Sequence, residues 1–160
     1  MNTDKLEKII NENFEKKEKV NPKSDRKIIK AINETIDLVD QGKIRVANKI
    51  NGSWIVNQWI KKAILLSFRV NKMTMSKGPY TTWYDKVPGK TVKWKESDWK
   101  KAGYRHVPNG VVRRGSFIAK NAVLMPSFIN LGAYVDEGTM IDTWASVGSC
   151  AQVGKNCHIS

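Results

Sequence analysis

Hydrophobic side chains in the first seventy residues recur at the spacing of an α-helix. Helices are predicted on this period over residues 4–19, 24–40 and 58–68. Between the second and the third, short strand-like segments are predicted over residues 44–47 and 54–56, joined by Asn51-Gly52, a pair typical of hairpin turns. Residues 71–107 show no sustained period apart from a short helical stretch at 96–101. The pattern therefore predicts a mainly helical N-terminal domain over residues 1–107.

From Val111 onwards the period of the apolar positions becomes six. Every sixth residue is large and apolar, in the order Val111, Phe117, Val123, Ile129, Val135, Ile141, Val147, Val153 and Ile159. From the second repeat on, a compact residue stands two positions before each of them, and from the fourth repeat on a turn former follows. Because neither an α-helix nor an ordinary strand has a period of six, the pattern indicates a solenoid of short strands and tight corners.

Three such sides close one turn of a triangular prism, so about 18 residues form one coil, and stacked coils pair their strands in parallel. The predicted fold class is mixed α and β: a helical N-terminal domain followed by a parallel β-helix over residues 108–160. The chain stops at Ser160 without a capping element, and open sheet edges favour aggregation. We therefore expect a β-helix that is incomplete at its C-terminus, in a chain whose natural form continues or whose gene is truncated. A partner that closes this end is the alternative.

The formal charge of +13 raises the question of an anionic partner. The lysines are spread along the chain without a block of five or six, which disfavours nucleic acid and favours a small anionic substrate. The longest apolar run, over residues 63–68, is too short to span a bilayer, so no membrane partner is expected. Cys150 and Cys157 occupy compact positions near the solenoid repeat and are predicted to be free thiols, and no metal site is expected.

Several segments together closely resemble the tetrahydrodipicolinate N-succinyltransferase family of hexapeptide-repeat acyltransferases. They include Gly103-Tyr104-Arg105 and Ile141-Asp142-Thr143-Trp144, and as a set they cover residues 61–69, 85–88, 103–108, 123–127, 132–145 and 147–152. The resemblance extends over essentially the whole chain, including the helical region. It is more specific than the six-residue repeat, which alone leaves the acyl group and its acceptor open.

The resemblance implies a left-handed β-helix in a homotrimer, with active sites between neighbouring subunits. It implies succinyl transfer from succinyl-CoA to the amino group of opened or hydrated tetrahydrodipicolinate, in the succinylase branch of diaminopimelate and lysine biosynthesis. The expected partners are thus a small dicarboxylate substrate and succinyl-CoA. No cofactor is expected to stay bound, because CoA enters as a cosubstrate, and the expected location is the cytoplasm.

By the same resemblance, Arg105 matches the family residue that contacts the dicarboxylate, and Asp142 matches its substrate-contacting, catalytic aspartate. A guanidinium suits a carboxylate because its planar fork donates two hydrogen bonds. A carboxylate suits the removal of a proton from the amine. The residues alone favour a surface arginine at Arg105 and a carboxylate that stabilises a corner at Asp142, and the resemblance reverses this preference. Glu137 is a weaker candidate, and His106 is interpreted as structural.

The residues that bind CoA remain unknown and are expected beyond Ser160. The 160-residue chain by itself is therefore expected to show no measurable transfer. Other possibilities are a hexapeptide acyltransferase with another acyl donor, such as acetyl-CoA, and a non-catalytic truncated fragment. The donor specificity would be decided by residues that lie outside this sequence.

Overall fold

The computed structural model describes every residue of the chain except Pro79. Its internal contacts divide the chain into two compact units, which are described separately below. The first comprises residues 1–38 and 45–88, and the second residues 39–44 and 89–160. The domain boundary expected between residues 107 and 108 stays a prediction.

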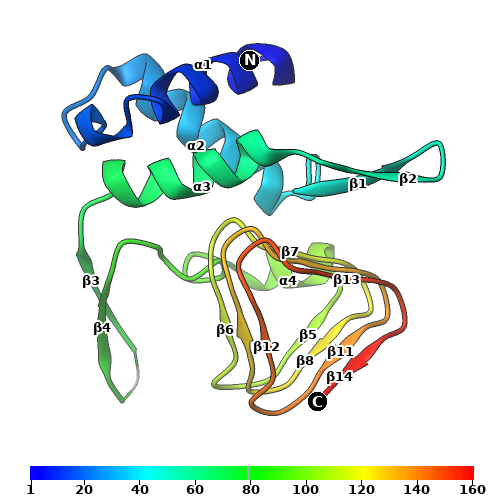
Figure 1. Ribbon diagram of the computed structural model, residues 1–160. Coiled ribbons are helices and arrows are strands. Elements are labelled where there is room, and N and C mark those ends of the chain that lie inside the picture. Colours follow the sequence, from blue (N-terminus) through cyan, green and yellow to red (C-terminus); the bar gives the residue numbers. More distant parts are fainter. Residues whose placement is uncertain (79) are drawn as a thin grey trace. The chain divides into compact units, whose positions relative to one another are not determined.

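The first unit is built from three helices and two β-hairpins (Figure 1). The helices are α1 (Thr3–Phe14), α2 (Arg26–Asp40, whose last residues belong to the second unit) and α3 (Gln58–Val70), with a 3-10 turn η1 at Lys17–Lys19. α1 packs against α3, and Leu6, Ile10, Ile32, Ile60 and Ile64 are fully buried. The three predicted helices are confirmed because their apolar stripes have a common core to fill, but the first ends at Phe14 and not at residue 19.

Two antiparallel hairpins complete this unit. The first joins β1 (Ala47–Ile50) to β2 (Ser53–Val56) through Asn51-Gly52, whose φ angles of 48° and 83° suit the turn predicted from this pair. The first strand lies next to the turn and not over residues 44–47 as predicted, because the pairing runs outward from Asn51-Gly52. The second pairs β3 (Thr74–Lys77) with β4 (Thr82–Asp85) and was not predicted, because its exposed strands have no regular apolar alternation.

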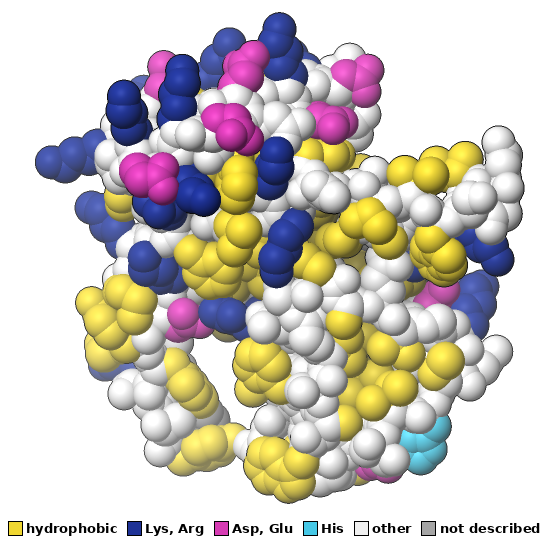
Figure 2. Space-filling model, viewed as in Figure 1, with side chains coloured by type: hydrophobic (Ala, Val, Ile, Leu, Met, Phe, Trp, Pro, Cys, Tyr) yellow, Lys and Arg dark blue, Asp and Glu magenta, His cyan; other side chains and the backbone are white. Residues whose placement is uncertain are grey.

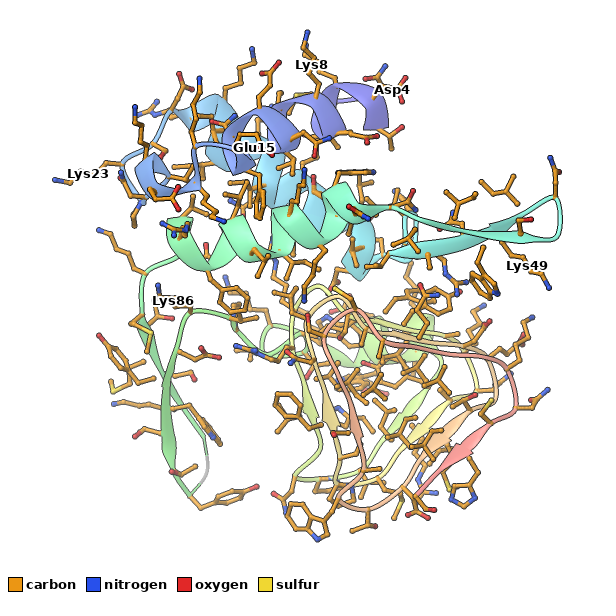
Figure 3. The ribbon with its side chains drawn as sticks, in the orientation of Figure 1. Asp4, Lys8, Glu15, Lys23, Lys49 and Lys86 are labelled. Carbon is orange, nitrogen blue, oxygen red and sulfur yellow. The ribbon has the colours of Figure 1, made fainter. Side chains whose placement is uncertain are left out.

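Charged side chains surround the helices of this unit. Figure 2 shows Lys, Arg, Asp and Glu interspersed over α1 to α3, and Figure 3 shows Asp4, Lys8 and Lys23 pointing away from the helices. The positive charges of α1 and η1 thus form exposed helix faces that also carry acidic residues. No helix in the described part of the chain combines the length and the apolar character that crossing a membrane requires.

The second unit is a three-sided parallel β-helix, preceded by α4 (Glu96–Ala102) (Figure 1). Its two-residue strands are β5 (Arg105–His106), β6 (Val111–Val112), β7 (Phe117–Ile118), β8 (Val123–Leu124), β9 (Phe128–Ile129), β10 (Tyr134–Val135), β11 (Met140–Ile141), β12 (Ser146–Val147), β13 (Gln152–Val153) and β14 (His158–Ile159). They form three parallel sheets in the orders β5-β8-β11-β14, β6-β9-β12 and β7-β10-β13. The predicted fold class is confirmed, and the stacked coils are consistent with the left-handed type that the resemblance implies.

The register predicted for the first three repeats is wrong by one residue. Val112, Ile118 and Leu124 fill the interior, whereas Val111 is 45% exposed. Strand pairing joins Leu124 to Ile141 and Ile141 to Ile159, so the first of these coils is one residue shorter than the next. The residue is lost between Leu124 and Ile129, around Pro126. The sequence concealed the shift because each of the first three strands consists of two apolar residues.

An aromatic cluster covers the first end of the solenoid interior. The rings of Trp94, Trp99 and Tyr104 contact one another with centroids 4.8 to 6.0 Å apart. His106 occupies the inward position of β5 and lies 5.6 Å from Trp99. These side chains pack on the buried cluster that includes Leu124 and Ile141. His106 is therefore structural, as the sequence suggested.

Burial gives His106 a pH-dependent effect on stability. Loss of solvation lowers its pKa, and a backbone hydrogen bond to Gly110 only partly opposes this shift. As pH falls from about 7 to 5, the unfolded chain gains a proton that the folded chain resists, so the free energy of unfolding decreases. Urea denaturation followed by tryptophan fluorescence should show this decrease, and His106→Gln should reduce it. Equal pH slopes for both proteins would contradict this account.

Candidate functional site

The four-stranded face of the β-helix carries both sequence-predicted site residues. We use this name for the outward side of β5, β8, β11 and β14. Strand register aligns Arg105, Val123, Met140 and His158 in one outward column, while the alternate residues point inward. Adjacent strands lie about 4.8 Å apart, so the backbone of Arg105 stands about 10 Å from that of Met140. Asp142 follows Met140 by two residues. The fold thus brings Arg105 and Asp142, far apart in sequence, to one face.

Arg105 is held by its backbone, while its guanidinium stays available. Its backbone N–H donates to the carbonyl of Ala122 at 2.9 Å, and its side chain is exposed. None of the residues that the structure describes accepts a hydrogen bond from this guanidinium. A guanidinium in this state has all its donors free for a carboxylate ligand.

Asp142 lies directly after β11, at the corner where the four-stranded face ends. Its backbone N–H donates to the carbonyl of Ile159 at 2.8 Å. Its Oδ1 accepts the backbone N–H of Thr143 at 2.7 Å, and its Oδ2 lies 2.9 Å from Nε2 of His158. The hydrogen bond with His158 is the largest cause that holds the pKa of Asp142 below its ordinary value, and the bond from Thr143 adds to it. The carboxylate is therefore ionised at neutral pH.

His158 is the residue that sequence reasoning missed at this site. It stands outward on β14, in register with Met140 one coil earlier, which places its ring beside the carboxylate that follows β11. The sequence did contain a signal for this contact. Because Ile159 is an interior position, the residue before it must point outward, and the length of one coil places it beside the outward residues around Met140. Glu137 lies elsewhere and pairs with Lys155 at 3.2 Å, so its carboxylate is already engaged.

One cleft of the second unit is separate from this face. Its volume is about 750 Å³, and its lining includes Asp40, Lys43, Phe117 and Tyr134, but neither Arg105 nor Asp142. One lining lysine, Lys90, donates to Asp40 Oδ2 at 2.6 Å, and its burial lowers its pKa against the effect of that carboxylate. The geometry of the cleft alone would favour it as a binding site. We give more weight to the four-stranded face, because it combines a free guanidinium with an ionised carboxylate.

The residue types at these sites bear on metal and disulfide chemistry. Within the described residues, histidine, cysteine and acidic side chains do not gather in a group able to hold a metal ion. Cys150 and Cys157 are both free thiols, as predicted. The arrangement on the four-stranded face can bind a carboxylate at one end and take part in proton transfer at the other.

Comparison with known proteins agrees with this picture. A family model described as the N-terminal part of tetrahydrodipicolinate N-succinyltransferase matches residues 5–70. A protein of Parvibaculum lavamentivorans named 2,3,4,5-tetrahydropyridine-2,6-dicarboxylate N-succinyltransferase is 53% identical over 163 aligned residues, which cover 100% of this chain and 58% of the relative. Proteins of the same name from Methylorubrum extorquens and Dechloromonas aromatica are 54% and 52% identical, over 97% and 99% of this chain and 56% and 58% of theirs.

The three-sided parallel solenoid built on a six-residue repeat defines the class: a hexapeptide-repeat β-helix protein. Within that class, the sequence matches identify the chain as a member of the 2,3,4,5-tetrahydropyridine-2,6-dicarboxylate N-succinyltransferase family. The chain spans somewhat more than half the length of these curated relatives.

Proposed function

We propose that this chain supplies the acceptor-binding part of an enzyme that transfers a succinyl group from succinyl-CoA to tetrahydrodipicolinate, in diaminopimelate and lysine biosynthesis. The observation that carries the proposal is the free guanidinium of Arg105 on the same face as the ionised carboxylate of Asp142. The name shared by the relatives supplies the reaction, and the face supplies groups suited to its acceptor. The proposed place of action is the cytoplasm, where CoA thioesters are made and used.

The chemistry of acyl transfer to nitrogen explains the two roles. The acceptor carries two carboxylates, one of which Arg105 would bind through two parallel hydrogen bonds. The amine must lose a proton as it attacks the thioester, and the anion at Asp142 stabilises the positive charge that develops there. Holding the acceptor at both ends lowers the entropy cost of this attack. No prosthetic group is needed for these steps, since succinyl-CoA enters as a cosubstrate.

We further propose that the complete protein is a homotrimer with its active sites between subunits. The three-stranded face of β6, β9 and β12 has Val111 and Phe128 exposed in one outward column. Trp144, two residues after Asp142, is 85% exposed and adopts a φ of 63°. Exposed apolar side chains of this size favour a protein interface, and a left-handed conformation is costly for tryptophan. A subunit contact at Trp144 would place the partner beside Asp142.

Replacing Trp144 by glycine tests the proposed contact. Because glycine adopts this φ without strain, Trp144→Gly should not lower the free energy of unfolding of the second unit, and should raise it by no more than about 1 kcal/mol. The loss of the indole should raise the dissociation constant of the assembly at least about tenfold. Denaturant unfolding and sedimentation measure the two effects, with Trp144→Phe as the control that keeps an aromatic ring. Undiminished assembly of the glycine variant would exclude Trp144 from the interface.

A chimeric protein tests the proposed reaction. Residues 1–160 are joined to the remaining C-terminal part of the Parvibaculum lavamentivorans relative, and CoA release is measured with succinyl-CoA and acceptor. The chimera should release CoA from succinyl-CoA only when the acceptor is present. The 160-residue chain by itself should release none. A well-folded chimera without acceptor-dependent release would refute the proposal.

A further inference from the structure

The hydrogen bond between His158 and Asp142 has a direction that follows from its chemistry. An ionised carboxylate can only accept hydrogen bonds, and the surroundings of Asp142 keep it ionised. The proton in the 2.9 Å contact must therefore lie on Nε2 of His158. In the neutral imidazole this leaves Nδ1 with a free lone pair.

Asp142 itself is poorly suited to accept a proton. Its Oδ1 is engaged by the backbone N–H of Thr143, and its Oδ2 is engaged by His158. The same two bonds lower its pKa, with His158 as the larger cause, and thus weaken it as a base. An imidazole nitrogen with a free lone pair can accept a proton, and histidine is the side chain that most often acts as a general base.

The surroundings of His158 leave its free nitrogen accessible. The side chain is 59% exposed, and it stands in the same outward column as Arg105. The intervening positions, Val123 and Met140, are apolar, so they offer an acceptor no competing polar group. Among the described charged residues, Asp142 is the one in recorded contact with His158. Lys155 and Glu137 pair with each other at the preceding corner, and Arg105 lies three strands away.

We propose that His158 is the catalytic base of the transfer and that Asp142 acts as its positioning residue. This inference rests on the proposed function and names the group that takes the proton from the acceptor nitrogen. As the acceptor nitrogen bonds to the thioester carbonyl carbon, its proton moves to Nδ1 of His158. The C–S bond then breaks, and the imidazolium returns the proton to the departing CoA thiolate. Asp142 balances the charge of the imidazolium and keeps the proton of Nε2 in place.

Substitution of His158 in the chimera tests this assignment. His158→Gln keeps an amide donor near Asp142 but has no basic nitrogen, so kcat should fall at least about 100-fold with little change in the KM of the acceptor. Added imidazole should restore part of the activity of His158→Ala but not that of Asp142→Asn. His106→Gln, which changes the other histidine of the chain, should keep kcat. Unchanged kcat in His158→Gln, with the parent chimera active, would overturn the role of His158 and leave the proposed function standing.

An NMR spectrum of the imidazole nitrogens provides a readout that does not depend on activity. In the folded chimera, at a pH high enough for the imidazole to be neutral, Nε2 of His158 should carry the proton and Nδ1 should not, and Asp142→Asn should remove this preference. A proton on Nδ1 would overturn the inference whatever the kinetics show. A parent chimera without transfer activity would overturn the proposed function instead, and the spectrum would still decide whether His158 offers a free Nδ1.

Discussion

Replacing Asp142 with asparagine in the active chimera is expected to lower kcat at least about 100-fold, because His158 loses the anion that orients it and a general base contributes at least this much. Asparagine keeps an oxygen that can accept the backbone N–H of Thr143, so the corner after β11 should retain its shape. The variant loses the negative charge, and its amide can donate to His158, which would favour the wrong tautomer. Steady-state kinetics measure the effect, and sedimentation should show an unchanged assembly.

Asp136 provides a matched control for this substitution. Its Oδ1 accepts the backbone N–H of Glu137 at 2.8 Å, a bond of the same kind as that between Asp142 and Thr143. It occupies the equivalent position after β10, away from the four-stranded face. Asp136→Asn should therefore keep kcat within about threefold of the parent. Equal kinetics for both variants and the parent would remove Asp142 from the mechanism and leave it as a corner residue.

The second large effect concerns stability and tests the register of the β-helix. Leu124 is fully buried between inward residues of the adjacent coils, whereas Val123 is part of the outward column. Leu124→Ala should lower the free energy of unfolding by about 3 kcal/mol, as expected for a large buried aliphatic residue. Val123→Ala should cost less than about 1 kcal/mol. Urea denaturation measures both, and the reverse order would restore the uninterrupted six-residue register.

The architecture could be predicted from the sequence because each element carries a local signal. Helices α1 and α3 show apolar stripes, Asn51-Gly52 has the φ angles of a tight turn, and Ile129 to Ile159 keep the six-residue spacing of interior positions. The register of the first coil could not be predicted, since strands such as Val111–Val112 offer two apolar residues to one interior position. Only the pairing between coils decides which of the two is buried.

The candidate site was predictable in part for a similar reason. Arg105 and Asp142 were identified through motifs that match a family, and the strand order then placed them on one face. The contact between Asp142 and His158 joins residues on successive coils. Such a contact depends on how the coils stack, and a pattern along one coil does not record it. The aspartate was thus predicted without the histidine that determines its hydrogen bonding.

The account depends most on the claim that the four-stranded face binds the acceptor. Pyridine-2,6-dicarboxylate, a stable aromatic analogue of the cyclic acceptor, can be titrated calorimetrically into the chimera and two variants. Arg105→Met should weaken binding at least about tenfold, because hydrogen bonds between charged groups contribute about 1.5–3 kcal/mol. Lys43→Met, which removes a lysine from the large cleft, should leave the affinity unchanged. The opposite pattern, with Lys43 required and Arg105 dispensable, would contradict the account.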